Sequence, residues 1–175
     1  MYTLESGAVK KEEKPLAYVA LILHDIRSVL NVGAIFRTAE ALGVGEVIIS
    51  GYTPGPLDRF GRVRSDFHKA ALGAEDSLVW RRFENVEDVL QFIKNENREL
   101  LVLEQDVQAI DIRELKPSDL GDKQLALVVG NEVEGVDAAF LEAAGTILEI
   151  PMFGKKESFN VASAAAIALY ALLAQ

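Results

Sequence analysis

The sequence predicts an α/β protein in which a parallel sheet is flanked by helices on both faces. Short apolar runs rich in Val, Ile and Leu alternate along the chain with segments of helical periodicity. Runs that are apolar at nearly every position are typical of parallel strands, which are buried on both faces. The chain has 175 residues, half of them hydrophobic, with no internal repeat or low-complexity tract. We therefore expect a single domain with a full core.

The expected elements follow a polar lead-in, residues 1–16, and continue to the C-terminal end of the chain. Apolar runs predict strands at Ala17–Leu23, Glu46–Ser50, Leu78–Phe83, Leu100–Glu104, Gln124–Val129 and Thr146–Pro151. Apolar residues at helical spacing predict helices at Asn31–Leu42, Ser65–Leu72, Val86–Asn95, Asp137–Ala144 and Ser158–Leu173. Residues 51–64 should form a Gly- and Pro-rich loop, and residues 106–122 an irregular segment. Ligands in such sheets bind at the carboxyl ends of strands, so the loops there are the expected sites of function.

The composition excludes several kinds of site. The chain has no Cys and only two His, so disulfides, thiolate zinc sites and histidine metal clusters are ruled out, and we expect no metal. The formal net charge of −9 argues against general adhesion to nucleic acid or to an anionic membrane, but permits a local basic patch. Because the N-terminal residues contain no apolar run, we expect no signal peptide there. The apolar end Val161–Ala174 is shorter than the roughly 18 residues of a membrane span, so we expect a cytoplasmic protein.

The first predicted helix carries one residue that its core packing does not explain. Asn31 is a favoured N-cap residue, and the apolar residues that follow it form a core stripe from which Arg37 departs. Arg37 lies one turn after Gly33, and helical side chains lean toward the N-terminus. We expect its guanidinium to pass over the glycine and, with the first amides of the helix, to bind a phosphate or carboxylate. The alternative is a solvated arginine on a surface helix.

An acidic turn follows the strand predicted at Gln124–Val129. Gly130 ends the apolar run, and Glu132, Glu134 and Asp137 come after it. The turn is neither a P-loop nor a GxGxxG motif, and its carboxylates would repel a phosphate. It favours a ligand that offers hydrogen-bond donors or positive charge, such as an adenosine or a cationic group. The alternative is an acidic surface turn that caps the next helix.

The last predicted helix begins with polar residues and is otherwise apolar. Ser158 is the expected N-cap, and Asn160 then falls in the first turn, although Asn is a poor helix former. The two polar side chains suggest a binding site, unless they only satisfy free amides of the helix end. Because the helix is apolar nearly all round, we expect it to be buried on most sides.

The loop at residues 58–69 is basic in an acidic chain. Its basic side chains Arg59, Arg62, Arg64 and Lys69 and its acids Asp58 and Asp66 give a local charge of +2, with Phe60, Phe67 and His68 between them. Cations suit phosphates and aromatic rings suit bases, so the loop is a candidate nucleic-acid contact. A charged loop without function is the alternative.

The order and spacing of these stretches resemble a known family. Asn31-x-Gly33-x-x-x-Arg37, then Gly130-x-Glu132-x-x-Gly135, then Ile150-Pro151-Met152 with Ser158-x-Asn160-Val161, are similar to the three motifs of the SpoU (TrmH-like) RNA 2′-O-ribose methyltransferases of the SPOUT superfamily. The resemblance covers about residues 17–174. It implies a single catalytic domain at residues 17–175 with a deep C-terminal trefoil knot, a feature that periodicity alone would not predict. It also implies S-adenosylmethionine as methyl donor, tRNA or rRNA as substrate, and a homodimer.

The resemblance also assigns residues to roles. The implied catalytic residues are Asn31, Arg37, Glu132, Ser158 and Asn160; the cofactor-binding residues are Gly130, Asn131, Ile150, Met152, Phe159 and Asn160; and the RNA-binding residues are Arg37, Arg59, Arg62, Arg64, His68 and Lys69. The sequence departs from the family pattern at Ala162, where a second Ser is frequent, and at Phe159, where Leu is usual.

Arginine is a poor general base, because its pKa lies above about 12. We therefore expect Arg37 to clamp a phosphate, while that phosphate, a water molecule or a carboxylate such as Glu132 accepts the proton. Two other functions remain possible at this point: a catalytically idle RNA-binding or assembly factor of the same fold, and a nucleotide-binding protein that acts on a small metabolite.

Overall fold

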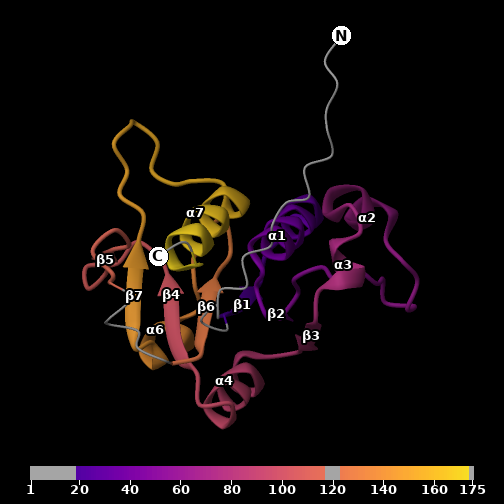
Figure 1. The fold of residues 1–175 in the computed structure, drawn as a ribbon, viewed down its shortest axis with the longest axis horizontal. Coiled ribbons are helices and arrows are strands. Elements are labelled where there is room, and N and C mark those ends of the chain that lie inside the picture. The colour runs from indigo at the N-terminus through magenta and orange to yellow at the C-terminus, as the bar shows by residue number, and fades with distance from the viewer. Residues whose placement is uncertain (1–18, 117–122, 174–175) are drawn as a thin grey trace, which may run out of the picture.

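The computed structural model describes residues 19–116 and 123–173, which form a seven-stranded sheet with strand order β3-β2-β1-β6-β4-β7-β5 (Figure 1). Every neighbouring pair is parallel, as predicted. The strands are β1 (Val19–His24), β2 (Glu46–Ser50), β3 (Trp80–Phe83), β4 (Glu99–Leu103), β5 (Ile110–Asp111), β6 (Leu125–Val129) and β7 (Thr146–Glu149). The helices are α1 (Val29–Leu42), α2 (Ser65–Ala71), α3 (Ala74–Ser77), α4 (Val86–Asn95), α6 (Ala138–Ala143) and α7 (Val161–Leu173).

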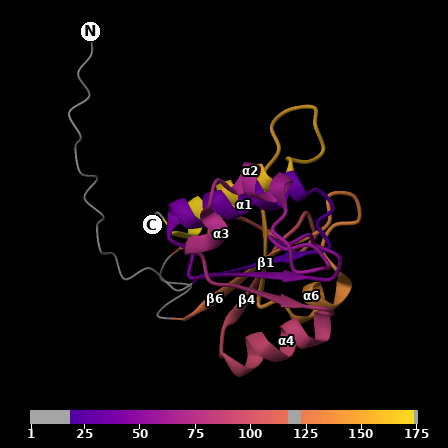
Figure 2. The same ribbon diagram turned by 90° about the vertical axis from the view of Figure 1, so that its right-hand side faces the viewer.

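Helices cover both faces of the sheet, because alternate residues of the central strands point to opposite sides. In β1, Leu21 and Leu23 pack in a cluster with α1, α2 and α7, whereas Ala20 and Ile22 pack in a second cluster with α4 and α6. Figure 2 shows the two helical layers above and below the strands. The central strands β1, β2 and β6 are buried at every position, which explains their continuous apolar runs.

The sheet brings together strands that are distant in sequence. The chain lays β1, β2 and β3 side by side in one direction and then places β4 on the other side of β1. The later strand β6 fills the position between β1 and β4, with Leu127 opposite Leu21 on one side and Leu101 on the other. The carboxyl ends of β2, β1, β6, β4 and β7 therefore meet along one edge of the sheet, where ligands bind in folds of this class.

Most predicted boundaries lie within two residues of those observed, and β2 and α4 match at both ends. The sequence pattern missed α3, a single turn, and β5, a two-residue strand in the segment expected to be irregular. The predicted lead-in, residues 1–16, lies outside the described residues, as do residues 17, 18 and 117–122.

Two predicted helix caps are wrong, and both corrections leave a side chain free for the site. Ser28 caps α1 in place of Asn31, since its Oγ accepts the Asn31 N–H at 3.3 Å, and Asn31 falls in the first turn. Asn160 caps α7 in place of Ser158, since its Oδ1 accepts the Ala162 N–H at 2.9 Å and its carbonyl accepts the Ala164 N–H at 2.9 Å. The helix α7 therefore begins three residues later than predicted.

The expectation that the last helix is buried on most sides is only partly correct. Its small residues Ala165 and Ala168 are fully buried in the core that α7 shares with α1. On the opposite side, Ile167 is 38% and Tyr170 is 64% exposed. An apolar surface is thus left open on α7.

Gly33 allows α1 and α2 to approach each other closely. A Cβ atom built on this buried glycine would lie 2.6 Å from the Cβ of Ala70 and 3.0 Å from the carbonyl oxygen of Phe67. Next to this contact the rings of Phe36 and Phe67 meet edge to face at 5.1 Å. The missing side chain makes room for α2, rather than for the guanidinium of Arg37 as the sequence suggested.

Replacing Gly33 by Ala should therefore push α2 away from α1. We expect a loss of about 1–3 kcal/mol in the free energy of unfolding from overpacking, offset by up to about 1 kcal/mol because Ala favours a helix. Urea denaturation measures the difference. The double variant Gly33→Ala/Ala70→Gly should recover stability beyond additivity, and Gly154→Ala, where an added Cβ meets nothing within 4 Å, serves as the control. A Gly33→Ala protein as stable as the wild type would contradict this account.

Candidate functional site

A cavity of about 330 Å³ opens at the sheet edge where the loops converge. Its lining comes from the ends of β4, β6 and β7, the loops that follow them and the start of α7. The volume is that of a small-molecule site. Of the residues predicted from the sequence, the lining includes Gly130, Asn131, Glu132, Ile150, Ser158 and Phe159. The cavity thus gathers parts of the second and third motifs, whereas Met152, Asn160, Asn31 and Arg37 are not among its lining.

Glu132 joins the loop after β6 to the start of α1. Its carboxylate accepts the backbone N–H groups of Arg27 at 3.0 Å and Ser28 at 3.4 Å. It also accepts the side-chain amide of Asn31 at 3.1 Å. A carboxylate is well placed here, because the free amides at a helix N-terminus carry partial positive charge.

The surroundings of Glu132 keep its carboxyl group ionised. Partial burial raises its pKa. Hydrogen bonds from the Arg27 N–H, the Asn31 side chain and the Ser28 N–H together outweigh this effect, so the pKa lies below the ordinary 4.5. A carboxylate that is hard to protonate is a weak base. The geometry therefore suits Glu132 to hold its neighbours in place better than to take up a proton.

Asn31 continues this connection to the third motif. Its Oδ1 accepts the side-chain amide of Asn160 at 3.2 Å, and Asn160 in turn caps α7. We call Glu132, Asn31 and Asn160 the polar bridge. It links one residue from each of the three motifs, and Asn31 lies 101 residues before Glu132 and 129 residues before Asn160 along the chain.

Asn131 holds the loop after β6 in place through its side-chain hydrogen bonds. Its Oδ1 accepts the N–H groups of Val133 at 2.7 Å and Glu134 at 2.9 Å, which closes a tight turn. Its Nδ2 donates to the carbonyl oxygen of Asp25 at 2.9 Å and also to the hydroxyl of Tyr52. The side chain of Asn131 is thus used to hold the loops after β1, β2 and β6 together.

The sequence reasoning missed Glu104 and Gln105, which follow β4 and line the cavity. Glu104 accepts the N–H of Val136 at 2.8 Å and lies against Gly135, where a Cβ would come within 2.5 Å of its Oε2. Gln105 donates to the carbonyl oxygen of Glu157 at 2.8 Å and so holds the segment before α7. Their position directly after a buried strand was the available signal, since the other site residues follow strands in the same way.

Arg37 lies outside the cavity on the exposed surface of α1. Its side chain makes no hydrogen bond or ion pair with any residue in 19–116 or 123–173. Its guanidinium is therefore free, as far as the described part of the chain goes, to contact a ligand that approaches from solvent.

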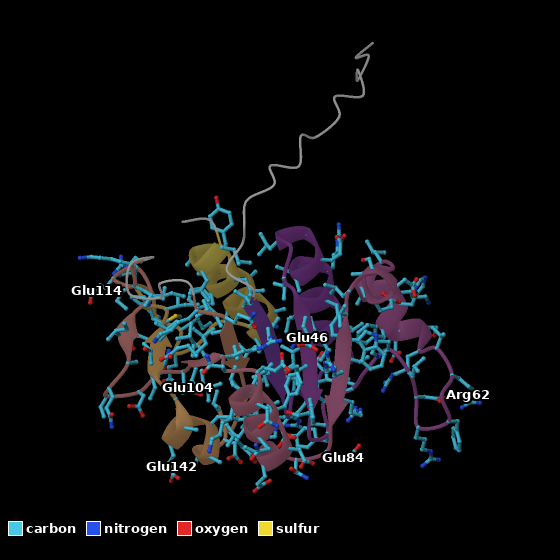
Figure 3. The ribbon with its side chains drawn as sticks, turned by 60° about the horizontal axis from the view of Figure 1, so that its bottom comes forward. Glu46, Arg62, Glu84, Glu104, Glu114 and Glu142 are labelled. Carbon is cyan, nitrogen blue, oxygen red and sulfur yellow. The ribbon has the colours of Figure 1, made fainter. Side chains whose placement is uncertain are left out.

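Several charged side chains of the basic loop are paired with carboxylates, which its composition alone did not indicate. Arg62 pairs with Asp58 at 2.8 Å, Arg64 with Asp66 at 3.3 Å, and His68 with Glu75 at 2.6 Å. Phe67 is fully buried against Phe36 and cannot meet a base. Within the described residues, Arg59 and Lys69 form no ion pair. Arg62 lies at the edge of the molecule, far from Glu104 (Figure 3).

The described residues contain neither a metal-binding cluster nor a membrane-spanning helix. No group of three or more His, Asp or Glu side chains there could hold a metal ion. No helix within these residues has the length and apolar character needed to cross a membrane.

Replacing Glu132 by Gln should remove a pH-dependent part of the stability. Because its pKa is lowered by folding, Glu132 stabilises the fold above the unfolded-state pKa of about 4.5, and this contribution is lost as the pH falls through the folded-state pKa. We expect Glu132→Gln to cost about 1 kcal/mol at pH 7, and the difference from wild type to shrink toward about pH 3, as measured by urea denaturation. Glu134→Gln, whose side chain makes no hydrogen bond within the described residues, is the control. A constant difference across this pH range would contradict the assignment.

Comparisons with known proteins agree with the geometry. A model of the SpoU rRNA Methylase family matches residues 18–170. A Bacillus subtilis protein named as a TrmH-family tRNA/rRNA methyltransferase is 30% identical over 168 residues, which are 95% of this chain and 61% of that protein. The 23S rRNA (guanosine-2′-O-)-methyltransferase RlmB of Bordetella pertussis is 31% identical over 156 residues, or 86% of this chain and 57% of that one. The chain thus spans less than two thirds of the length of both relatives.

A solved structure agrees as well. The crystal structure of an AdoMet-bound rRNA methyltransferase from Sinorhizobium meliloti superposes with a TM-score of 0.80 and 25% identity, covering 90% of this chain and 56% of that one. The family model covers nearly all of the described residues, and the three motifs meet in one place. The chain belongs to the SpoU rRNA methylase family.

Proposed function

We propose that this chain is the catalytic part of an S-adenosylmethionine-dependent methyltransferase that methylates a ribose 2′-hydroxyl in tRNA or rRNA. The observation that carries the proposal is the polar bridge, which joins one residue from each of the three family motifs beside a cavity of small-molecule size. The relatives are named as tRNA or rRNA methyltransferases, and one of them as a guanosine 2′-O-methyltransferase.

The residues that line the cavity fit S-adenosylmethionine. The described lining contains carboxylates, among them Glu104 and Glu149, and no Lys, Arg or His, so it does not repel a sulfonium. Gly130 lines the cavity and packs directly on the loop that follows, since a Cβ there would lie 2.5 Å from the carbonyl oxygen of Gly135. Backbone groups at Gly130, Ile150 and Phe159 would hold the cofactor, with Asn131, Met152 and Asn160 as their neighbours. When bound, the cofactor supplies an electrophilic methyl group.

The residues around the cavity then position the RNA. Arg37, free of partners in the described residues, clamps the phosphate next to the target ribose through its planar fork of donors. Ser158 lines the cavity, and its hydroxyl would hydrogen-bond the attacking 2′-hydroxyl. Because the pKa of Glu132 is lowered and its oxygens already accept three donors, the proton goes to the RNA phosphate or to a water molecule. Catalysis rests on holding the two reactants in line.

RNA contacts extend from Arg37 to the basic loop. Of the residues predicted there, Arg59 and Lys69 form no ion pair within the described residues, whereas the charges of Arg62 and Arg64 are partly neutralised by Asp58 and Asp66, and the His68 ring bonds to Glu75. A modest and salt-sensitive affinity follows for a chain with a net charge of −9.

A homodimer is also part of this proposal. The apolar side chains of Leu30, Ile167 and Tyr170 are exposed by 58%, 38% and 64% on α1 and α7, which pack against each other. A second copy would remove this surface from water. An Ile167→Glu/Tyr170→Glu variant should elute as a monomer in size-exclusion chromatography with light scattering, and a Val79→Glu control should not.

We further propose that residues 17–175 form a single domain with a trefoil knot near its C-terminal end, and that the protein acts on RNA in the cytoplasm. Two features support a knot: β6 lies between the earlier strands β1 and β4, and α7 returns from the edge of β7 to pack on α1. A protein that binds S-adenosylmethionine but transfers no methyl group to RNA would instead be the idle factor, a reading that no observation favours.

Replacing Arg37 by Ala should lower kcat/KM for methyl transfer about 100-fold or more, because the phosphate clamp is lost, and leave the Kd for S-adenosylmethionine within about twofold. Transfer of labelled methyl groups to bulk tRNA and rRNA, with mass spectrometry of the modified ribose, measures the effect; Lys94→Ala is the control. In Arg37→Lys we expect partial activity with the pH profile of the wild type. A Lys variant whose rate recovers only at high pH would instead make this residue the proton acceptor.

A further inference from the structure

The basic loop contains a short, well-held hairpin with an exposed aromatic ring at its tip. Leu57 and Val63 pair as an antiparallel bridge, and the Asp58 N–H donates to the Arg62 carbonyl oxygen at 2.8 Å. The Asp58 carboxylate accepts the N–H groups of Phe60 at 2.8 Å and Arg62 at 3.0 Å. Gly61 turns the chain with a φ of 75°, a conformation that favours glycine. The tip therefore has a defined shape.

Phe60 is presented at this tip rather than packed into the fold. Its ring is 65% exposed, and the guanidinium carbons of Arg59 and Arg62 lie 4.7 Å and 5.0 Å from the ring centre. By contrast, Phe67 of the same segment is fully buried. The exposed ring thus contributes no core packing, while two cations hold it in place.

The hairpin is also fixed relative to the candidate site. Arg64 follows the hairpin directly, and its N–H donates to the Pro56 carbonyl oxygen at 2.9 Å. The helix α2 begins at the next residue. The helix α2 packs on α1 through the contact of Ala70 with Gly33. Because α1 also carries Asn31 and Arg37, the ring and the polar bridge belong to one connected packing unit.

We propose that Phe60 is a stacking platform for an unpaired RNA base, so that the RNA is engaged through a single-stranded segment. The proposal rests on the proposed function only in taking RNA as the partner. A flat ring flanked by guanidinium groups matches a base between two phosphates. Bases inside an A-form duplex are paired and stacked on their neighbours, and the ring cannot reach their faces. The chemistry thus selects a loop, a bulge or an end over a continuous helix.

Fluorescence anisotropy with the full chain can test this with two labelled probes: a mixed-sequence RNA of about 12 nucleotides as a single strand, and the same strand in a duplex. We expect Phe60→Ala to weaken single-strand binding about tenfold or more and to leave duplex binding within about twofold. Phe60→Trp should bind like the wild type and Phe60→Leu like the Ala variant. Val63→Ala, which removes a 69% exposed apolar side chain from the same hairpin, should change neither.

A spectroscopic readout separates stacking from a structural role. The chain contains one Trp, so Phe60→Trp in a Trp80→Phe background places a single fluorophore at the tip. Stacking on a base should quench its fluorescence with the single strand and not with the duplex. The proposal is overturned by wild-type affinity in Phe60→Ala, by equal losses for both probes, by full affinity in Phe60→Leu, or by no quenching.

These outcomes are distinct from failure of the proposed function. Methyl transfer by the wild type to bulk tRNA or rRNA, with unchanged single-strand binding in Phe60→Ala, overturns the stacking role alone. Absence of both S-adenosylmethionine binding and methyl transfer in the wild type overturns the proposed function, whatever Phe60 does.

Discussion

The candidate site depends on a single carboxylate, that of Glu132, which accepts the backbone amides of Arg27 and Ser28 directly before α1. Without it, the loop after β6 would keep only the bonds of Asn131 to the loops after β1 and β2, and Asn31 would lose its partner in that loop. Its bond to Asn31 orients that side chain so that the other end of the amide meets Asn160, the cap of α7. The start of α1, the loop after β6 and the start of α7 are thereby held in one arrangement. The same bonds keep Glu132 ionised, so its carboxylate is better suited to holding its neighbours in place than to taking up a proton.

A second constraint relates the cavity to the more distant surface. Gly33 lets α2 lie directly on α1, and the hairpin that carries Phe60 precedes α2 without an intervening linker. One face of α1 thus packs on the sheet, one receives α2, and its exposed surface presents Arg37. A ligand that spans the cavity and the hairpin would meet a surface already in place. This fits the proposed methyltransferase, which would hold a long polymer and a small donor together.

Local patterns predicted most of the fold, and tertiary contacts account for what they missed. The strand β6 is apolar at every position and α4 is amphipathic behind a good cap, so both could be located from sequence. The order of the strands in the sheet could not be predicted from sequence, because it depends on which distant apolar runs pair with each other. Ser28 and Asn31 are equally good cap residues, and in the structure Ser28 caps the helix while the Asn31 side chain bonds to the distant Glu132. In the same way, the sequence shows how many charges the basic loop carries, but it does not show that Arg62 pairs with Asp58.

The polar bridge can be tested most directly through residues that do not touch. Methyl transfer from labelled S-adenosylmethionine to RNA would be measured for the wild type, Glu132→Ala, Asn160→Ala and the double variant. If Asn31 connects the two residues into one unit, each single change should lower kcat/KM about 100-fold, and the double variant should be little worse than the poorer single one. Losses that simply multiply, or single variants with wild-type activity, would contradict the claim that these three motifs act as one site.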